Sequence, residues 1–116
     1  MMNPTECKDI TDVRKCIDEI DVNIITNLAL RASFVKKAAE FKKSISEVKA
    51  ADRVKLMMET RRVWAQENNL NADFVQSIFE NIVDYFVKGE VKEWAHNRVI
   101  EPDITIELAT INDASA

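Results

Sequence analysis

The sequence predicts an all-α protein in which three helices, the first of them very long, form one small helical domain. The 116 residues include a single Gly and two Pro, which leaves few positions for the tight turns that a sheet requires. Val and Ile residues recur three or four positions apart, a spacing that indicates helices and not strands. The content of 47% hydrophobic and 31% charged residues is ordinary for a soluble globular domain.

The first helix is expected over residues 9–43, which contain no Gly or Pro and give a helix of about 35 residues. Asp9 or Thr11 is the expected N-cap. The apolar side chains form one stripe, at Ile10, Val13, Ile17, Ile20, Ile24, Leu28, Val35 and Ala38. A chain of this size cannot bury so long a stripe with its remaining residues, so the stripe predicts pairing with a second copy.

Two cations, Arg31 and Lys42, occupy positions on this stripe. They are eleven residues apart, which brings them back to nearly the same face of a continuous helix. A buried cation is costly unless an anion meets it, so the stripe is expected to contain a binding place for negative charge. The alternative is that both side chains bury their stems and keep their charged ends in water.

Arg14 lies too far from Arg31 for one small ligand to contact both within one chain. The separation is 17 residues, or roughly 25 Å along a straight helix. Either Arg14 is unrelated to the site, or a second helix running antiparallel brings the Arg14 of another chain to Arg31 and Lys42.

The rest of the chain is expected to fold back on the first helix. Residues 44–49 break the helical spacing and contain two Ser, so we expect a loop there. A second helix is expected from about Ala50 to Glu67, with Arg53 in its first turn, where it could reach over a ligand held by Lys42. A cation at a helix start is mildly unfavourable, which favours an anionic partner for Arg53 over simple exposure.

The third helix, with Asn71 as its N-cap, has the most apolar stripe in the chain. Glu90 falls on that stripe directly after Gly89, and such local conflicts are typical of functional positions. The alternatives for Glu90 are an ion pair with a nearby cation or exposure at a fraying end. The helical domain is therefore expected to span residues 1–98, followed by a tail over residues 99–116 that is extended or disordered.

Composition argues against several other functions. The net charge of −4 does not favour nucleic acid as a partner. Cys7 and Cys16 form no metal-binding pattern with the single His96 and are expected to be free thiols. We expect no metal and no organic cofactor, because the sequence has neither a ligand cluster nor a Gly-rich phosphate loop. No signal peptide or membrane-spanning run is evident, so a cytoplasmic location without membrane association is expected.

Several motifs together resemble the all-α chorismate mutase family. They are Asp12-Val13-Arg14, Arg31 with Val35-Lys36-Lys37-Ala38-Ala39, Phe41-Lys42, Arg53-Val54 and Trp64-Ala65-Gln66-Glu67-Asn68, with Glu90 on the last helix. Within the family, the sequence is similar to the small isochorismate-pyruvate lyases of salicylate and siderophore biosynthesis. The resemblance implies an intertwined homodimeric helical bundle with two active sites, each with Arg14 from one chain and the other charged residues from its partner.

The resemblance also implies the chemistry of the site. The substrate would be chorismate or isochorismate, a dicarboxylate that reacts by a pericyclic route without covalent attack by the protein. Arg14 and Arg31 would hold its carboxylates, Arg53 would close the site, and Lys42 would donate a hydrogen bond to the ether oxygen as the C–O bond breaks. The dry wall around the ring would be formed by Val35, Ala38 and Val87.

Glu90 departs from the pattern, because many members have Gln at this position and an ionised Glu cannot donate a hydrogen bond. Relatives with Glu are known in the wider family, where protonation restores the donor. The expected function is an isochorismate-pyruvate lyase, with or without a weak chorismate mutase activity. The alternatives are a chorismate mutase, an aminodeoxychorismate mutase, or a non-catalytic helical module that uses the dimer seam and the tail.

Overall fold

The computed structural model describes residues 2–96, and these residues contain helices and no strands. The helices are a 3-10 turn at Pro4–Glu6, α1 at Ile10–Ala39, α2 at Ile45–Lys49, α3 at Ala51–Glu67 and α4 at Ala72–His96. The prediction of an all-α fold with a long first helix is confirmed for this part of the chain. The predicted tail, residues 99–116, lies outside the described residues. No helix within residues 2–96 combines the length and apolar character needed to cross a bilayer.

The chain divides into two compact units, Met1–Phe34 and Val35–Ala116, and α1 runs from the first into the second. In the first unit, the Asp9 carboxylate accepts a hydrogen bond from the Asp12 amide over 2.9 Å. In return, the Asp12 carboxylate accepts one from the Lys8 amide over 3.0 Å. These reciprocal bonds satisfy amides at the start of the helix, so Asp9 is the N-cap.

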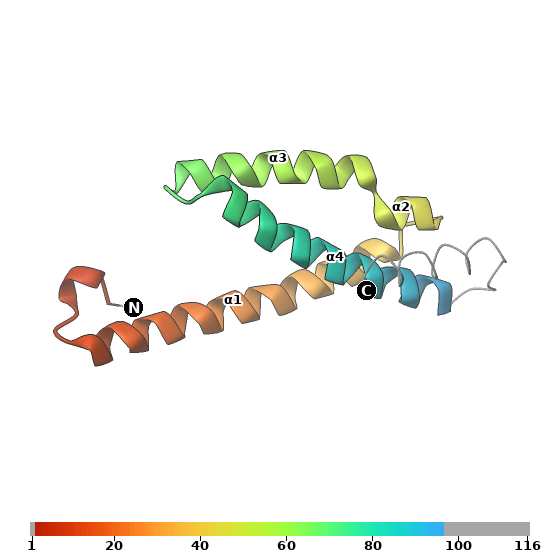
Figure 1. Ribbon diagram of the computed structural model, residues 1–116. Coiled ribbons are helices and arrows are strands. Elements are labelled where there is room, and N and C mark those ends of the chain that lie inside the picture. Colours follow the sequence, from red (N-terminus) through yellow and green to blue (C-terminus); the bar gives the residue numbers. More distant parts are fainter. Residues whose placement is uncertain (1, 97–116) are drawn as a thin grey trace. The chain divides into compact units, whose positions relative to one another are not determined.

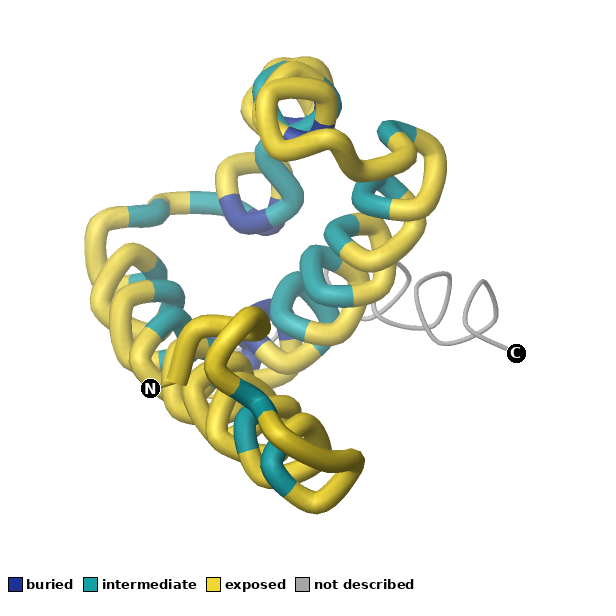
Figure 2. Tube along the Cα trace, turned by 90° about the vertical axis from the view of Figure 1, so that its left-hand side faces the viewer, coloured by how far each residue is buried: buried dark blue, intermediate teal, exposed yellow. Residues whose placement is uncertain are grey.

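The apolar stripe of α1 is exposed in the single chain. No residue of α1 is buried, and most of the helix is coloured as exposed in Figure 2. Ile10 is 58% exposed, Ile17 49% and Ile24 52%. An exposed apolar row of this length is typical of a surface that another element covers.

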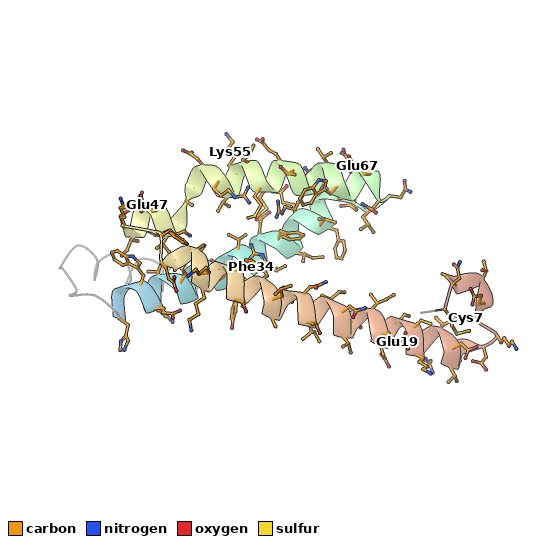
Figure 3. All side chains as sticks on the ribbon, turned by 180° about the vertical axis from the view of Figure 1, so that it is seen from behind. Cys7, Glu19, Phe34, Glu47, Lys55 and Glu67 are labelled. Carbon is orange, nitrogen blue, oxygen red and sulfur yellow. The ribbon has the colours of Figure 1, made fainter. Side chains whose placement is uncertain are left out.

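Cys7 and Cys16 are both free thiols, as predicted. Cys7 lies in the first unit, just after the 3-10 turn, beside the start of α1 (Figure 3). Partial burial raises the pKa of the Cys7 thiol, and the neighbouring Cys16 thiol raises it further. Cys7 is therefore less reactive as a nucleophile at neutral pH than an exposed cysteine.

The first helix ends earlier than predicted, at Ala39 instead of residue 43. The amides of Glu40, Phe41 and Lys42 each bond to the carbonyl three residues earlier, over 3.0 to 3.2 Å. Bonds of this 3-10 type tighten the last turn and lead the chain off the helix axis. The prediction that Lys42 continues the stripe of Arg31 is therefore wrong, because Lys42 lies in the connection after the helix.

The predicted loop at residues 44–49 is also wrong, since Ile45–Lys49 forms the short helix α2. The Ser44 side chain is its N-cap and accepts a hydrogen bond from the Glu47 amide over 3.1 Å. Ile45 and Val48 are the two buried residues of α2, and their apolar side chains pack against α4. Of the two Ser residues that indicated a loop, Ser44 is therefore the N-cap of α2 and Ser46 lies within that helix.

A helical hairpin follows α2 in the described part of the second unit, with α3 and α4 side by side and running in opposite directions (Figure 1). Ala50, in the left-handed region at φ 42°, separates α2 from α3. Asn71 begins α4 as predicted, because its side chain accepts a hydrogen bond from the Phe74 amide over 2.9 Å. Arg62 of α3 bonds to Asp73 of α4 over 2.8 Å and fixes the closed end of the hairpin.

The main buried cluster joins α2 to α4. Its members are Ile45, Val48, Val91, Trp94 and Ala95, with Val87 packed against them. Val48 and Val91 are the most completely buried of these, at 1% and 0% exposed. This cluster holds the connection between α1 and α2 against the second half of α4, which brings Lys42 to that helix.

Candidate active site

Lys42 and Glu90 form a close ion pair on the second unit. Lys42 Nζ lies 2.7 Å from Glu90 Oε1, and the two residues are 48 positions apart in the sequence. The Glu90 side chain is 4% exposed and that of Lys42 is 23% exposed. A pair with so little exposure is only weakly screened by water, so removal of either partner leaves the other charge poorly compensated.

Lys42 makes two further contacts through its two ends. Its Nζ also donates to the backbone carbonyl of Val48 over 3.4 Å, and its own carbonyl accepts a hydrogen bond from Trp94 Nε1 over 3.3 Å. The ammonium group is therefore held between α2 and α4, and the backbone of the connection is held to α4.

Glu90 is buried as its place on the apolar stripe predicts. Within α4, Val83, Val87, Glu90 and Trp94 follow one another at steps of four, three and four residues, which places them on one face. Gly89 is exposed, and a methyl group at its Cβ position would meet nothing within 4 Å. Gly89 thus makes no room for Glu90 or for a ligand, and its coincidence with Glu90 in the sequence has no structural basis.

A pocket of about 460 Å³ is lined by residues of α2, α3 and α4, and neither Lys42 nor Glu90 is among them. Its lining residues are Lys49, Ala51, Val54, Lys55, Met58, Glu80, Val83, Asp84 and Val87. Val83 and Val87 continue towards Glu90 on the same face of α4, and Lys49 follows Val48, whose carbonyl contacts Lys42. Its volume is in the range of small-molecule sites, about 300 to 1,000 Å³.

The walls of this pocket combine apolar and charged groups. Val54, Met58, Val83 and Val87 supply apolar surface, whereas two lysines and two acidic residues supply charge. Asp84 is paired with Lys88 over 2.6 Å. This combination suits a ligand with a carbon ring and charged substituents.

The other predicted site residues are placed as follows. Val87 lines the pocket. Val35 is half-buried and Ala38 exposed on the last turns of α1, and Arg53 is exposed on the first turn of α3, next to Val54. Arg14 is exposed and Arg31 half-buried, and both belong to the first unit. Within the second unit, the structure therefore brings together Lys42 and Glu90, with Val87 one turn away.

Sequence reasoning missed two contacts of this site, the Val48 carbonyl and the Trp94 indole. A backbone carbonyl carries no sequence signal. Trp94 did carry one, because it follows Glu90 by four residues on the same face. Its exposure of 6% is typical of a packing residue, but its N–H has a partner as well.

The fold and the site define a class of small helical proteins that pair a lysine with a buried carboxylate on a helix. A family model described as chorismate mutase type II matches residues 13–91. The chain is 37% identical over 98 residues to the isochorismate pyruvate lyase of Pseudomonas aeruginosa, covering 84% of this chain and 97% of that protein. It is 31% identical over 85 residues to the bifunctional chorismate mutase/prephenate dehydratase of Buchnera aphidicola, covering 72% of this chain and 22% of that protein. The chain belongs to the chorismate mutase type II family.

Proposed function

We propose that the protein is an isochorismate-pyruvate lyase that converts isochorismate to salicylate and pyruvate. The observation that carries this proposal is the pair of Lys42 and Glu90, 2.7 Å apart, with Val87, which lines the pocket, one turn before Glu90. The match to the Pseudomonas lyase along 97% of that protein supports the lyase over other reactions of the family. In such a reaction a ring hydrogen moves to the methylene carbon of the enolpyruvyl group while the ether C–O bond breaks, and the ring becomes aromatic.

Lys42 is the group that we assign to the ether oxygen. An ammonium group has three N–H donors, and two of those of Lys42 have partners in Glu90 and Val48. The third is the one that would meet the oxygen. Partial negative charge develops on that oxygen as the bond breaks, so the hydrogen bond strengthens in the transition state and lowers the barrier.

Binding would depend on cations that grip the two carboxylates and fold the enolpyruvyl group over the ring. We assign this role to Arg31, Arg53 and the partner chain's Arg14, since guanidinium groups match carboxylates with paired hydrogen bonds. The ring would lie against Val87, with Val35 and Ala38 opposite it. Catalysis by fixing a reactive conformer needs no covalent step, and we propose no metal and no organic cofactor.

A homodimer with shared sites completes the proposal. The exposure of the α1 stripe supports it, because a second copy would bury side chains such as Ile17, 49% exposed, and Ile20, 43% exposed.

We also propose a cytoplasmic location, since Cys7 and Cys16 are free thiols. The salicylate that the enzyme makes would supply siderophore synthesis. Nucleic acid and membranes are not proposed as partners.

The second candidate is a chorismate mutase, which the match to the Buchnera protein favours. A mutase would use the same cations on chorismate, and an aminodeoxychorismate mutase would do so on the amino analogue. Incubation of the purified protein with isochorismate and with chorismate, followed by identification of the products, separates these reactions. Salicylate and pyruvate support the lyase, prephenate supports the mutase, and no product from any of the substrates favours a non-catalytic helical module.

The dimer gives a first testable prediction. We expect sedimentation at micromolar concentration to show a species of twice the chain mass of 13.3 kDa. Ile17→Lys, in the exposed stripe, should shift this species to the monomer and abolish turnover, because a charge would enter the seam. Glu19→Lys, two residues further along and so on the opposite face of α1, should keep the dimer. A fully active wild-type monomer would show that the site is not shared.

Glu90 gives a second prediction. In Glu90→Gln the amide oxygen can still accept a hydrogen bond from Lys42, and the amide N–H₂ can donate one to the substrate ether oxygen. We therefore expect this variant to keep its turnover of isochorismate. A folded Glu90→Gln protein without turnover would contradict this role of Glu90.

A further inference from the structure

The indole of Trp94 has a specific polar partner in addition to its packing contacts. Trp94 is 6% exposed within the cluster of α2 and α4. Its Nε1 donates a hydrogen bond to the backbone carbonyl of Lys42 over 3.3 Å, across 52 residues of sequence. A buried indole N–H needs an acceptor, and here that acceptor belongs to the residue whose ammonium group Glu90 holds.

The contacts of Trp94 and Glu90 act on opposite ends of one residue. Glu90 accepts from Lys42 Nζ over 2.7 Å, and Trp94, one helical turn later on the same face of α4, donates to the Lys42 carbonyl. A single rigid helix thus fixes both the backbone and the side-chain end of Lys42.

Lys42 needs such external support because of where it lies. It belongs to the connection between α1 and α2, where helical hydrogen bonds do not fix the backbone on both sides. Its four-carbon side chain adds many rotamers, which would spread the position of the ammonium group. A small displacement of a donor can lower a rate by about 10².

We infer that Trp94 is a positioning residue that sets the place of the Lys42 ammonium group through the Lys42 backbone. This inference rests on the proposed function for its effect on turnover, but the position of Lys42 can be tested without turnover. The part of Trp94 that matters is its N–H, because another aromatic ring can fill the same space.

Trp94→Phe keeps an aromatic ring and removes the donor. We expect kcat to fall by about 10- to 100-fold, with KM changed by less than about threefold because the carboxylate-binding arginines stay in place. The melting temperature should change little. Trp64→Phe, which removes an exposed indole from α3, is the matched control and should keep wild-type kcat.

A chemical readout follows Lys42 itself. Trace acetylation of the lysines, quantified by peptide mass spectrometry, gives the reactivity of Lys42 relative to its exposed neighbour Lys43. In the wild type, Glu90 holds the Lys42 amine and slows its reaction. In Trp94→Phe the ratio of Lys42 to Lys43 acetylation should rise severalfold. If Trp94 only packed against its neighbours and did not set the position of the Lys42 backbone, the ratio would stay unchanged.

These measurements separate the two proposals. A raised acetylation ratio in a protein that acts on neither isochorismate nor chorismate would support the positioning of Lys42 and overturn the proposed function. Wild-type kcat together with a wild-type acetylation ratio in Trp94→Phe would overturn the role of Trp94. If Trp94→Phe loses its helical circular dichroism, benzothienylalanine at position 94 removes the N–H with almost no change in shape. Its kcat and acetylation ratio should then show the same changes, and wild-type values would overturn the inference.

Discussion

Replacement of Lys42 by Ala is expected to lower kcat by on the order of 10² to 10³ or more. The ammonium group lies against a carboxylate that is 4% exposed, in surroundings where a charge-assisted donor is worth more than it is in water. We assign to it the hydrogen bond that strengthens as the ether C–O bond breaks. Its loss should therefore raise the barrier of the chemical step and have a smaller effect on binding.

The assay is steady-state turnover of isochorismate, with salicylate detected by fluorescence and the fold followed by circular dichroism. Lys43→Ala is the matched control, because Lys43 is the exposed neighbour, and it should keep wild-type turnover. Lys42→Ala also removes the cation next to Glu90 and leaves a buried carboxylate without its partner, which lowers stability. Lys42→Gln keeps a polar partner for Glu90 and should be folded but equally slow. Near-normal turnover in a folded Lys42→Gln protein would show that Lys42 is not the donor.

Most of the fold could be predicted from the spacing of apolar residues. The second and third helices expected from the sequence correspond to α3 and α4. Their meeting ends lie close to the expected residues, because the polar residues after Glu67 break the spacing and Asn71 is a strong N-cap. The end of α1 could not be predicted in this way. No Gly or Pro marks Ala39, and the turn that follows depends on tertiary contacts of the connection with α2 and α4.

The pairing of Lys42 with Glu90 was not itself predicted, because the family resemblance only assigned both residues to one site. Lys42 was placed on the helical stripe of Arg31, but it lies beyond the end of the helix. The sequence did offer a cation near Glu90 as one alternative, since a carboxylate on an apolar stripe needs a partner. An ion pair with a nearby cation had been the alternative to a role in catalysis for Glu90, and the structure shows this pair, with the pocket residue Val87 one turn before Glu90. The two interpretations are therefore compatible.

The contact of Trp94 with Lys42 could not be predicted, because it joins a side chain to a backbone carbonyl 52 residues away. Sequence patterns report which faces are apolar, and they do so through side chains. They carry no information about where a given carbonyl lies once a helix has ended. The same limit applies to Val48, whose carbonyl completes the contacts of the ammonium group.

Mixing two inactive variants is expected to restore activity if the proposed sites are shared between chains. Arg14→Ala and Lys42→Ala should each be inactive as homodimers, because each lacks one group in both sites. In a mixed dimer, one site would lack both groups. The other would combine the intact Arg14 of the Lys42→Ala chain with the intact Lys42 of the Arg14→Ala chain. Random assortment makes half of the dimers mixed, each with one intact site of two, so the recovered turnover should be about one quarter of the wild-type value.

The control is a mixture of Lys42→Ala with Arg31→Ala, two residues that the proposal assigns to the same chain of each site. Every site in that mixture lacks one of the two groups, whichever chains pair, so no activity should return. The two variants are unfolded together, refolded and assayed at equal total protein concentration, and sedimentation confirms that dimers have formed again. Restoration in the first mixture alone would support a site built from Arg14 of one chain and Lys42 of the other. If neither mixture regains activity, or if both do, Arg14 does not cross to the partner's site.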